Sequence, residues 1–117
     1  MNRFGSHVRQ ARQRLQECDP RYSLRQVAFR ANIQPTYLSK LERGELEPPS
    51  EVTTRRLAEE LGEDPDVLLA LAGKVSSDLQ EIIRRRPKLF ADLIRELKKA
   101  PDHGILRIVR EIRDGQW

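Results

Sequence analysis

Residues 23–44 read SLRQVAFRANIQPTYLSKLERG, and this stretch decides the fold of the 117-residue chain. It predicts two short helices joined by a tight turn. Ser23 and Gln26 have the spacing of a capping box, in which a serine at the helix start and a glutamine one turn later satisfy each other's backbone N–H groups. Apolar residues recur at helical spacing on both sides of the turn, so we expect the two helices to pack together. These residues are Leu24, Val27, Ala28, Ala31, Ile33, Leu38 and Leu41.

The second helix carries a polar face on the side away from that packing. Its members are Gln34, Thr36, Tyr37, Ser39, Lys40 and Arg43. Side chains of these types hydrogen-bond to base edges and phosphates, and the set contains no carboxylate that phosphates would repel. Glu42 is expected to pair with a basic residue, and Gly44 suits the left-handed backbone that ends many helices. The pattern predicts a DNA-binding surface.

Here the sequence resembles the Cro/CI-type (XRE) helix-turn-helix family. The resemblance rests on Ser23, Gln26, Val27, Ala28, Ile33, Thr36, Leu38, Ser39, Leu41, Glu42 and Gly44. The later stretches ERGELEPPS and RLAEELGEDPDVLLALAG are similar to the family's fourth and fifth helices. Two positions differ from the family pattern. Asn32 replaces the usual glycine of the turn but tolerates a left-handed backbone, whereas Leu24 replaces a glutamine that contacts phosphate in many relatives.

The resemblance implies an all-α protein, with a five-helix lambda-repressor-like domain over residues 1–74 and about three further helices over residues 75–117. Helical spacing places the first helix at about residues 4–18, with an inner stripe of Phe4, Val8, Ala11, Leu15 and Cys18. Ser50 is expected to cap the fourth helix, and Asp64 with Pro65 to begin the fifth. Their inward residues are expected to be Val52, Leu57, Ala58 and Leu61, and then Val67, Leu68, Leu71 and Ala72.

The C-terminal segment is apolar along one face of each expected helix. A helix capped by Ser76 or Ser77 ends at the run Arg84–Pro87, and two more follow. About forty residues are too few for a secure core of their own, so this face must pack on the first domain or on a second copy. We favour a homodimer, because helix-turn-helix proteins commonly bind two half-sites; the alternative is a monomer with folded-back helices. The expected dimerisation residues are Leu79, Ile83, Phe90, Leu93, Ile94, Leu97, Ile105, Ile108, Val109, Ile112 and Trp117.

The resemblance also implies roles for individual side chains, because the second helix of such a motif lies in the major groove. The residues expected to read bases are Gln34, Pro35, Thr36, Ser39 and Lys40. Glutamine can pair with adenine and lysine with guanine, whereas proline offers only apolar contact. The residues expected to contact phosphate are Arg25, Gln26, Tyr37, Arg43 and Arg9 or Arg12. For Tyr37 a purely structural role is equally open.

Charge and cysteine content limit the alternatives. The chain has a net charge of +4, and residues 1–44 hold nine Lys or Arg against three Asp or Glu, which suits a polyanionic partner. The lone Cys18 excludes an intramolecular disulfide, and with His7 and His103 far apart it forms no zinc site. We expect no metal, no cofactor and no enzymatic activity, because no phosphate loop or activated nucleophile is present. With no membrane-spanning run or signal peptide, we expect a cytoplasmic, nucleoid-associated protein.

The resemblance implies a dimeric repressor that binds an inverted-repeat operator of double-stranded DNA through residues 34–43, and the absence of an evident ligand or activation domain agrees with repression. Two alternatives assign the C-terminal helices to a protein partner. One is an antitoxin that neutralises a toxin, and the other is a repressor controlled by a protease or an antirepressor. A non-specific architectural DNA binder is less favoured, because the polar face carries several short side chains in place of a uniform row of lysines.

Overall fold

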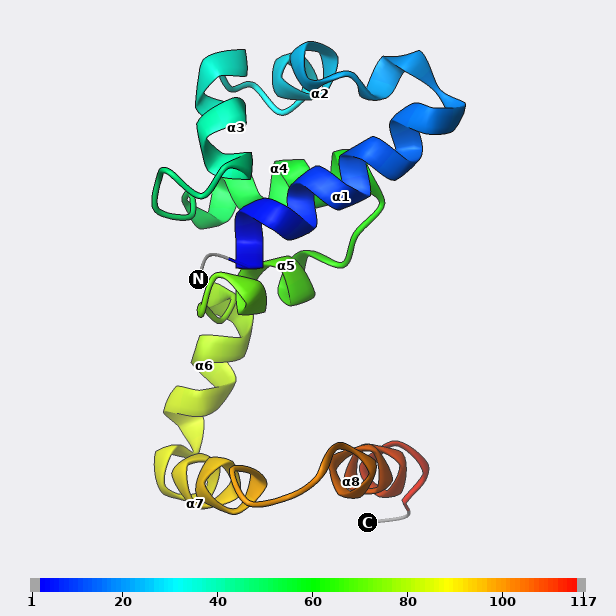
Figure 1. Ribbon diagram of the computed structural model, residues 1–117. Coiled ribbons are helices and arrows are strands. Elements are labelled where there is room, and N and C mark those ends of the chain that lie inside the picture. The colour runs from blue at the N-terminus through cyan, green and yellow to red at the C-terminus, as the bar shows by residue number, and fades with distance from the viewer. Residues whose placement is uncertain (1–2, 116–117) are drawn as a thin grey trace. The chain divides into compact units, whose positions relative to one another are not determined.

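The computed structural model describes residues 3–115, and all regular structure in that range is helical (Figure 1). The expected all-α class is confirmed. The described helices are α1 (Arg3–Cys18), the short 3₁₀ helix η1 (Pro20–Tyr22), α2 (Leu24–Arg30), α3 (Pro35–Glu42), α4 (Glu51–Leu61), α5 (Pro65–Leu71), α6 (Ser77–Arg85), α7 (Pro87–Leu97) and α8 (Asp102–Asp114). The chain divides into two compact units, unit 1 ending at Ser76 and unit 2 beginning at Ser77. The sequence placed this boundary after residue 74.

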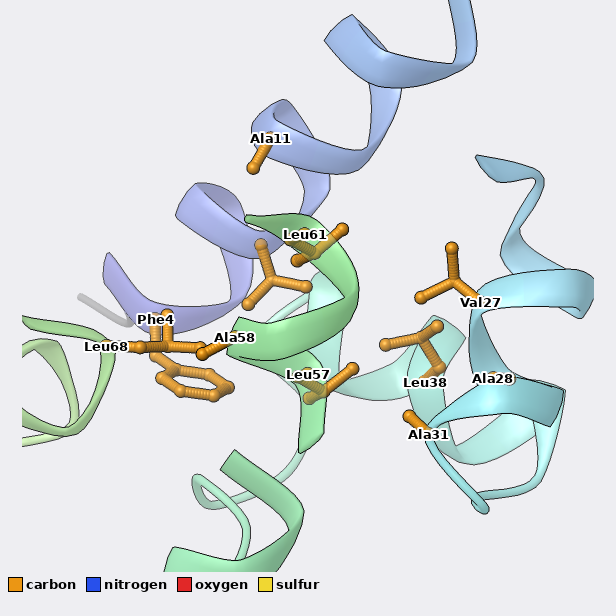
Figure 2. Packing of buried hydrophobic residues seen from close by; sticks show 11 residues of the cluster. Phe4, Ala11, Val27, Ala28, Ala31, Leu38, Leu57, Ala58, Leu61 and Leu68 are labelled. Atoms are coloured by element: carbon orange, nitrogen blue, oxygen red, sulfur yellow. The ribbon is translucent and has the colours of Figure 1, made fainter. Parts of the chain in front are cut away.

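Unit 1 has one apolar core, to which each of the five α-helices contributes. Its buried members are Phe4, Val8, Ala11, Val27, Ala28, Ala31, Leu38, Leu57, Ala58, Leu61 and Leu68. In Figure 2 the side chains of Leu38 and Leu57 point toward each other across this core. The apolar spacing of residues 23–44 therefore predicted the packing of α2 on α3, because all seven apolar residues expected to face inward are buried or half-buried.

Three residues that were expected to face inward are exposed instead. Cys18 lies at the end of α1, while Val52 and Val67 are 58% and 51% exposed. In α4 the buried residue of the first turns is Thr54, which has helical spacing to Leu57, Ala58 and Leu61. The Thr54 hydroxyl donates a hydrogen bond to the carbonyl oxygen of Pro49 at 3.5 Å, so its polar atom is satisfied inside.

Local signals set most helix boundaries as expected. Ser23 Oγ accepts a hydrogen bond from the Gln26 N–H at 3.3 Å, and Ser50 Oγ accepts one from the Thr53 N–H at 3.3 Å. The other half of the expected capping box is not formed, because the Ser23 N–H donates to the Pro20 carbonyl oxygen at 3.2 Å in place of the Gln26 side chain. Asn32 has φ of 60°, the left-handed conformation expected of the turn. Pro35 is the first residue of α3, where a missing N–H removes no intrahelical bond.

Unit 2 consists of α6, α7 and α8, and no residue of these three helices is fully buried. Helix α6 begins at Ser77 and therefore leaves Ser76 in the preceding position. Arg86 separates α6 from α7, so the expected stop at the arginine run is confirmed. Nine large apolar side chains of unit 2 are exposed, whereas those of Ile83, Phe90, Leu97 and Ile105 are half-buried. Trp117 lies outside the described residues.

Gly5 allows α1 to approach α3 closely. A Cβ atom at this position would overlap the Leu41 carbonyl oxygen and lie 3.2 Å from the Glu42 carbonyl oxygen. Backbone atoms cannot move aside as a flexible side chain can. The contact between the first turn of α1 and the last turn of α3 therefore requires glycine.

We predict that Gly5→Ala lowers the free energy of unfolding of unit 1 by about 1–3 kcal/mol, because the new methyl group forces α1 and α3 apart. Urea unfolding, followed by the NMR signals of buried unit 1 residues, measures this change. Gly104→Ala, followed by the NMR signals of α8, is the matched control in unit 2: it is also a helical glycine, but its Cβ would lie 3.6 Å from the Pro101 side chain, an ordinary contact. Equal stability of the two variants would contradict the close approach at Gly5.

Candidate nucleic-acid interface

Helices α2 and α3 and the turn between them form the candidate interface. The Ile33 N–H donates to the Ala28 carbonyl oxygen at 2.9 Å, which closes the turn after the left-handed Asn32. Gln34 is the N-cap residue of α3, and its side chain makes no capping hydrogen bond. The side-chain amide of Gln34 therefore plays no part in capping α3.

The five residues expected to read bases lie on the first two turns of α3. Gln34, Thr36 and Lys40 are exposed, whereas Pro35 and Ser39 are half-buried. Residues near the start of a recognition helix are those that reach base edges when the helix lies in the major groove. The geometry thus brings all five to the part of α3 where base contacts are made in this motif.

The residues expected to contact phosphate lie on α2, on α3 and its C-cap, and on α1. Arg9, Arg25, Gln26 and Arg43 are exposed, and Tyr37 is half-buried. Arg43 forms an ion pair with Glu45, with 3.1 Å between Nη2 and Oε2, and both side chains are 52% exposed. An exposed pair of this kind contributes only about 0–1 kcal/mol to stability, so Arg43 can exchange Glu45 for a phosphate.

Arg12 departs from the expectation that it contacts phosphate. Its side chain is buried, and its Nε and Nη2 atoms donate to the two carboxylate oxygens of Glu42 at 2.7 and 2.9 Å. Nη1 donates to the Gln16 side chain at 3.0 Å and to the Tyr22 carbonyl oxygen at 3.3 Å. This guanidinium is fully engaged inside unit 1, which removes Arg12 from the set of phosphate contacts. The expectation that Glu42 pairs with a basic residue is confirmed.

The Arg12–Glu42 pair also shapes the charge of the interface. Glu42 is the only carboxylate between residues 23 and 44, and it is 6% exposed. The exposed charges of α2 and α3 are therefore all positive, and they belong to Arg25, Arg30, Lys40 and Arg43. Burial of the one acidic side chain leaves a surface that attracts an anion.

A second set of contacts, not predicted from the sequence, fixes α2. Arg30 pairs with Glu60 of α4 at 2.6 Å and donates to the Arg21 carbonyl oxygen at 2.7 Å. Its guanidinium also lies over the ring of Tyr22, 5.3 Å from the centroid, a cation–π distance. These contacts hold the C-terminal end of α2 against α4 and η1. Arg30 and Glu60 are 30 residues apart in the sequence, so only the folded chain shows that they form a pair.

The η1 segment that precedes α2 is held by a local pair. Asp19 accepts hydrogen bonds from the Arg21 backbone N–H at 3.0 Å and from the Arg21 guanidinium at 2.7 Å. These hydrogen bonds, the side-chain one first, lower the pKa of Asp19 to about 2. The carboxylate of Asp19 therefore stays charged, and able to accept both hydrogen bonds, at pH values well above its pKa of about 2.

A concavity of about 590 Å³ lies between α2 and the start of α3. It is lined by Arg25, Phe29, Asn32, Ile33, Gln34, Pro35 and Tyr37. Phe29 was not among the functional residues expected from the sequence. Its position beside the apolar stripe of α2 gave no sign that the ring points outward.

A family model described as a helix-turn-helix domain matches residues 3–71. The chain belongs to the helix-turn-helix family. The match spans α1 to α5, and domains of this family bind DNA, so we treat unit 1 as the DNA-binding part of the protein. No curated protein and no solved structure matches the chain significantly.

Residues 3–115 contain no cluster of three or more His, Cys, Asp or Glu side chains able to hold a metal ion. Across the same range, no helix has the length and apolar character needed to cross a membrane.

We predict that Arg12→Met lowers the free energy of unfolding of unit 1 by about 3–5 kcal/mol, because it leaves the Glu42 carboxylate buried without a partner. The double variant Arg12→Met with Glu42→Leu should recover most of this loss, since neither charge is then buried alone. Urea unfolding measures both effects. Arg14→Met, an exposed change on the same helix, should stay within about 0.5 kcal/mol of the parent chain. A small effect of Arg12→Met would contradict a structural role for the pair.

Proposed function

We propose that the protein is a sequence-specific transcriptional repressor of the Cro/CI (XRE) type, which binds an inverted-repeat operator as a homodimer. The observation that carries the proposal is the exposed set of uncharged and basic side chains on α3, within residues 23–44, where the only carboxylate, that of Glu42, is buried. Binding at a promoter would exclude polymerase, and this places the protein in the cytoplasm on the nucleoid.

Sequence reading is assigned to the first turns of α3. Gln34 and Lys40 are long, exposed and able to discriminate adenine and guanine respectively through their hydrogen-bonding atoms. Thr36 and Ser39 are short and suit a close approach of the helix to the bases. Each good contact discriminates by about 1–3 kcal/mol against a wrong base.

Affinity and register are assigned to the basic residues beside α3. Arg9, Arg25 and Arg43 are exposed and lie on three different helices or helix ends, so they can contact phosphates at separate points along the duplex. Gln26 and the Tyr37 hydroxyl supply neutral donors. These contacts do not depend on sequence but position α3 for base reading.

Homodimerisation is assigned to unit 2. Nine of its large apolar side chains are between 37% and 68% exposed: Leu79, Ile82, Leu89, Leu93, Ile94, Leu106, Ile108, Val109 and Ile112. Exposed apolar side chains in this number, on helices with no buried residue, favour an interface with a second copy. The half-buried Ile83, Phe90, Leu97 and Ile105 extend the same surface.

We predict that the full-length protein selects an inverted repeat from a random duplex library at physiological salt, with half-site centres about one helical turn apart. Sedimentation of the free protein should show a dimer. A monomeric protein that selects a single half-site would contradict the homodimer and favour a different partner for unit 2, such as a toxin or an antirepressor. Binding without any enriched sequence would contradict the repressor proposal itself.

We predict that Lys40→Ala changes the preferred base at one position of each half-site, because Lys40 reads a base edge. Arg43→Ala should instead weaken binding to all sequences and reduce the slope of log affinity against log salt by about 1, as expected for the loss of a phosphate contact. Fluorescence anisotropy over a salt series, with the selected duplex and single-base variants of it, measures both. If the two variants lose only general affinity, Lys40 is not a base reader.

A further inference from the structure

Phe29 is the most exposed of the large apolar side chains among the described residues, with 83% of its surface accessible. It lies on α2, whose inward face is formed by Val27 and Ala28. The ring contributes nothing to the core of unit 1. An aromatic side chain held outward on a short, well-anchored helix is suited to contact something outside the chain.

The residues around Phe29 indicate the kind of partner that its ring contacts. Phe29 and Arg25 are one turn apart on α2 and both line the 590 Å³ concavity that separates α2 from the start of α3. The opposite wall includes Gln34, Pro35 and Tyr37, which belong to the candidate DNA surface. The concavity therefore continues that surface and combines an apolar ring with a cation.

The docking geometry of the motif selects the part of DNA that enters. When the start of the second helix meets base edges, the first helix of the motif crosses the sugar-phosphate backbone. A deoxyribose presents an apolar face next to an anionic phosphate, which matches a phenyl ring next to a guanidinium. We propose that Phe29 is a DNA-contact residue whose ring packs against one deoxyribose of the strand crossed by α2, with Arg25 on the adjoining phosphate. This inference rests on the DNA binding proposed above.

The test separates an apolar contact from a charged one. The probe is the duplex selected by the parent chain, or a random-sequence duplex of equal length. Phe29→Ala should weaken binding to both duplexes about tenfold per half-site, because a buried ring surface is lost. The salt slope should not change, since no counterion is involved, whereas Arg25→Ala should lower the slope by about 1.

Two controls make the result specific. Val67→Ala removes an exposed apolar side chain of α5, which lies outside the candidate interface, and should leave affinity unchanged. Phe29→Leu keeps an apolar side chain and should retain most of the affinity lost in Phe29→Ala. Because Phe29 is exposed, thermal unfolding of all these variants should match that of the parent chain.

Three results would overturn the inference. The first is parental affinity of Phe29→Ala, which would show that the ring does not touch DNA. The second is a change of preferred base in Phe29→Ala, which would place the ring on a base edge and not on a sugar. The third is equal weakening by Val67→Ala. Failure of the parent chain to bind either duplex is a different result, because it would reject DNA binding and not only the contact made by Phe29.

Discussion

The bidentate bond between Arg12 and Glu42 is the constraint on which the interface depends. It joins the middle of α1 to the last turn of α3 at 2.7 and 2.9 Å, and both side chains are nearly excluded from water. Two parallel N–H···O bonds fix orientation as well as distance. A buried ion pair of this kind adds little net stability compared with apolar packing, but it penalises any arrangement in which its partners separate. The pair thus selects one placement of α3 over others with similar apolar packing.

A second contact of α3 lies at the same end of the helix as the ion pair. Gly5 brings α1 against the carbonyl groups of Leu41 and Glu42. Leu38 packs the middle of α3 into the core, and Arg30 fixes the preceding helix by joining α2 to α4 and η1. The start of α3, in contrast, carries exposed side chains and uses no side-chain cap. The last turn of α3 is therefore held by α1, while its first turn is open to an external partner.

Much of unit 1 could be predicted because its signals are local. A serine cap, a left-handed asparagine and apolar residues at helical spacing each act over a single turn, so residues 23–44 predicted two packed helices and the turn between them.

The position of Arg12 could not be predicted in this way. Arg9, Arg12 and Arg14 all lie off the apolar stripe of α1, and only the approach of α3 distinguishes the one that is buried. The predictions that Val52 and Val67 face inward were wrong for a similar reason, because apolar character alone does not show which side of a short helix is covered by neighbouring helices. The exposure of Phe29 could not be predicted, because a single outward aromatic side chain leaves no periodic pattern in the sequence.

The ion pair between Arg43 and Glu45 limits the affinity that Arg43 would add to the proposed DNA complex. Glu45 occupies the guanidinium with a carboxylate, as a phosphate of DNA would, and so competes with the duplex for the same cation. Arg43 would contact a phosphate only by releasing Glu45, which offsets part of the attraction that an unpaired arginine would add. This offset is the same for every DNA sequence, so it leaves the ratio of the affinities for two sites unchanged. Under the proposed function, Glu45 therefore lowers the general affinity of unit 1 for DNA without taking part in the choice of site.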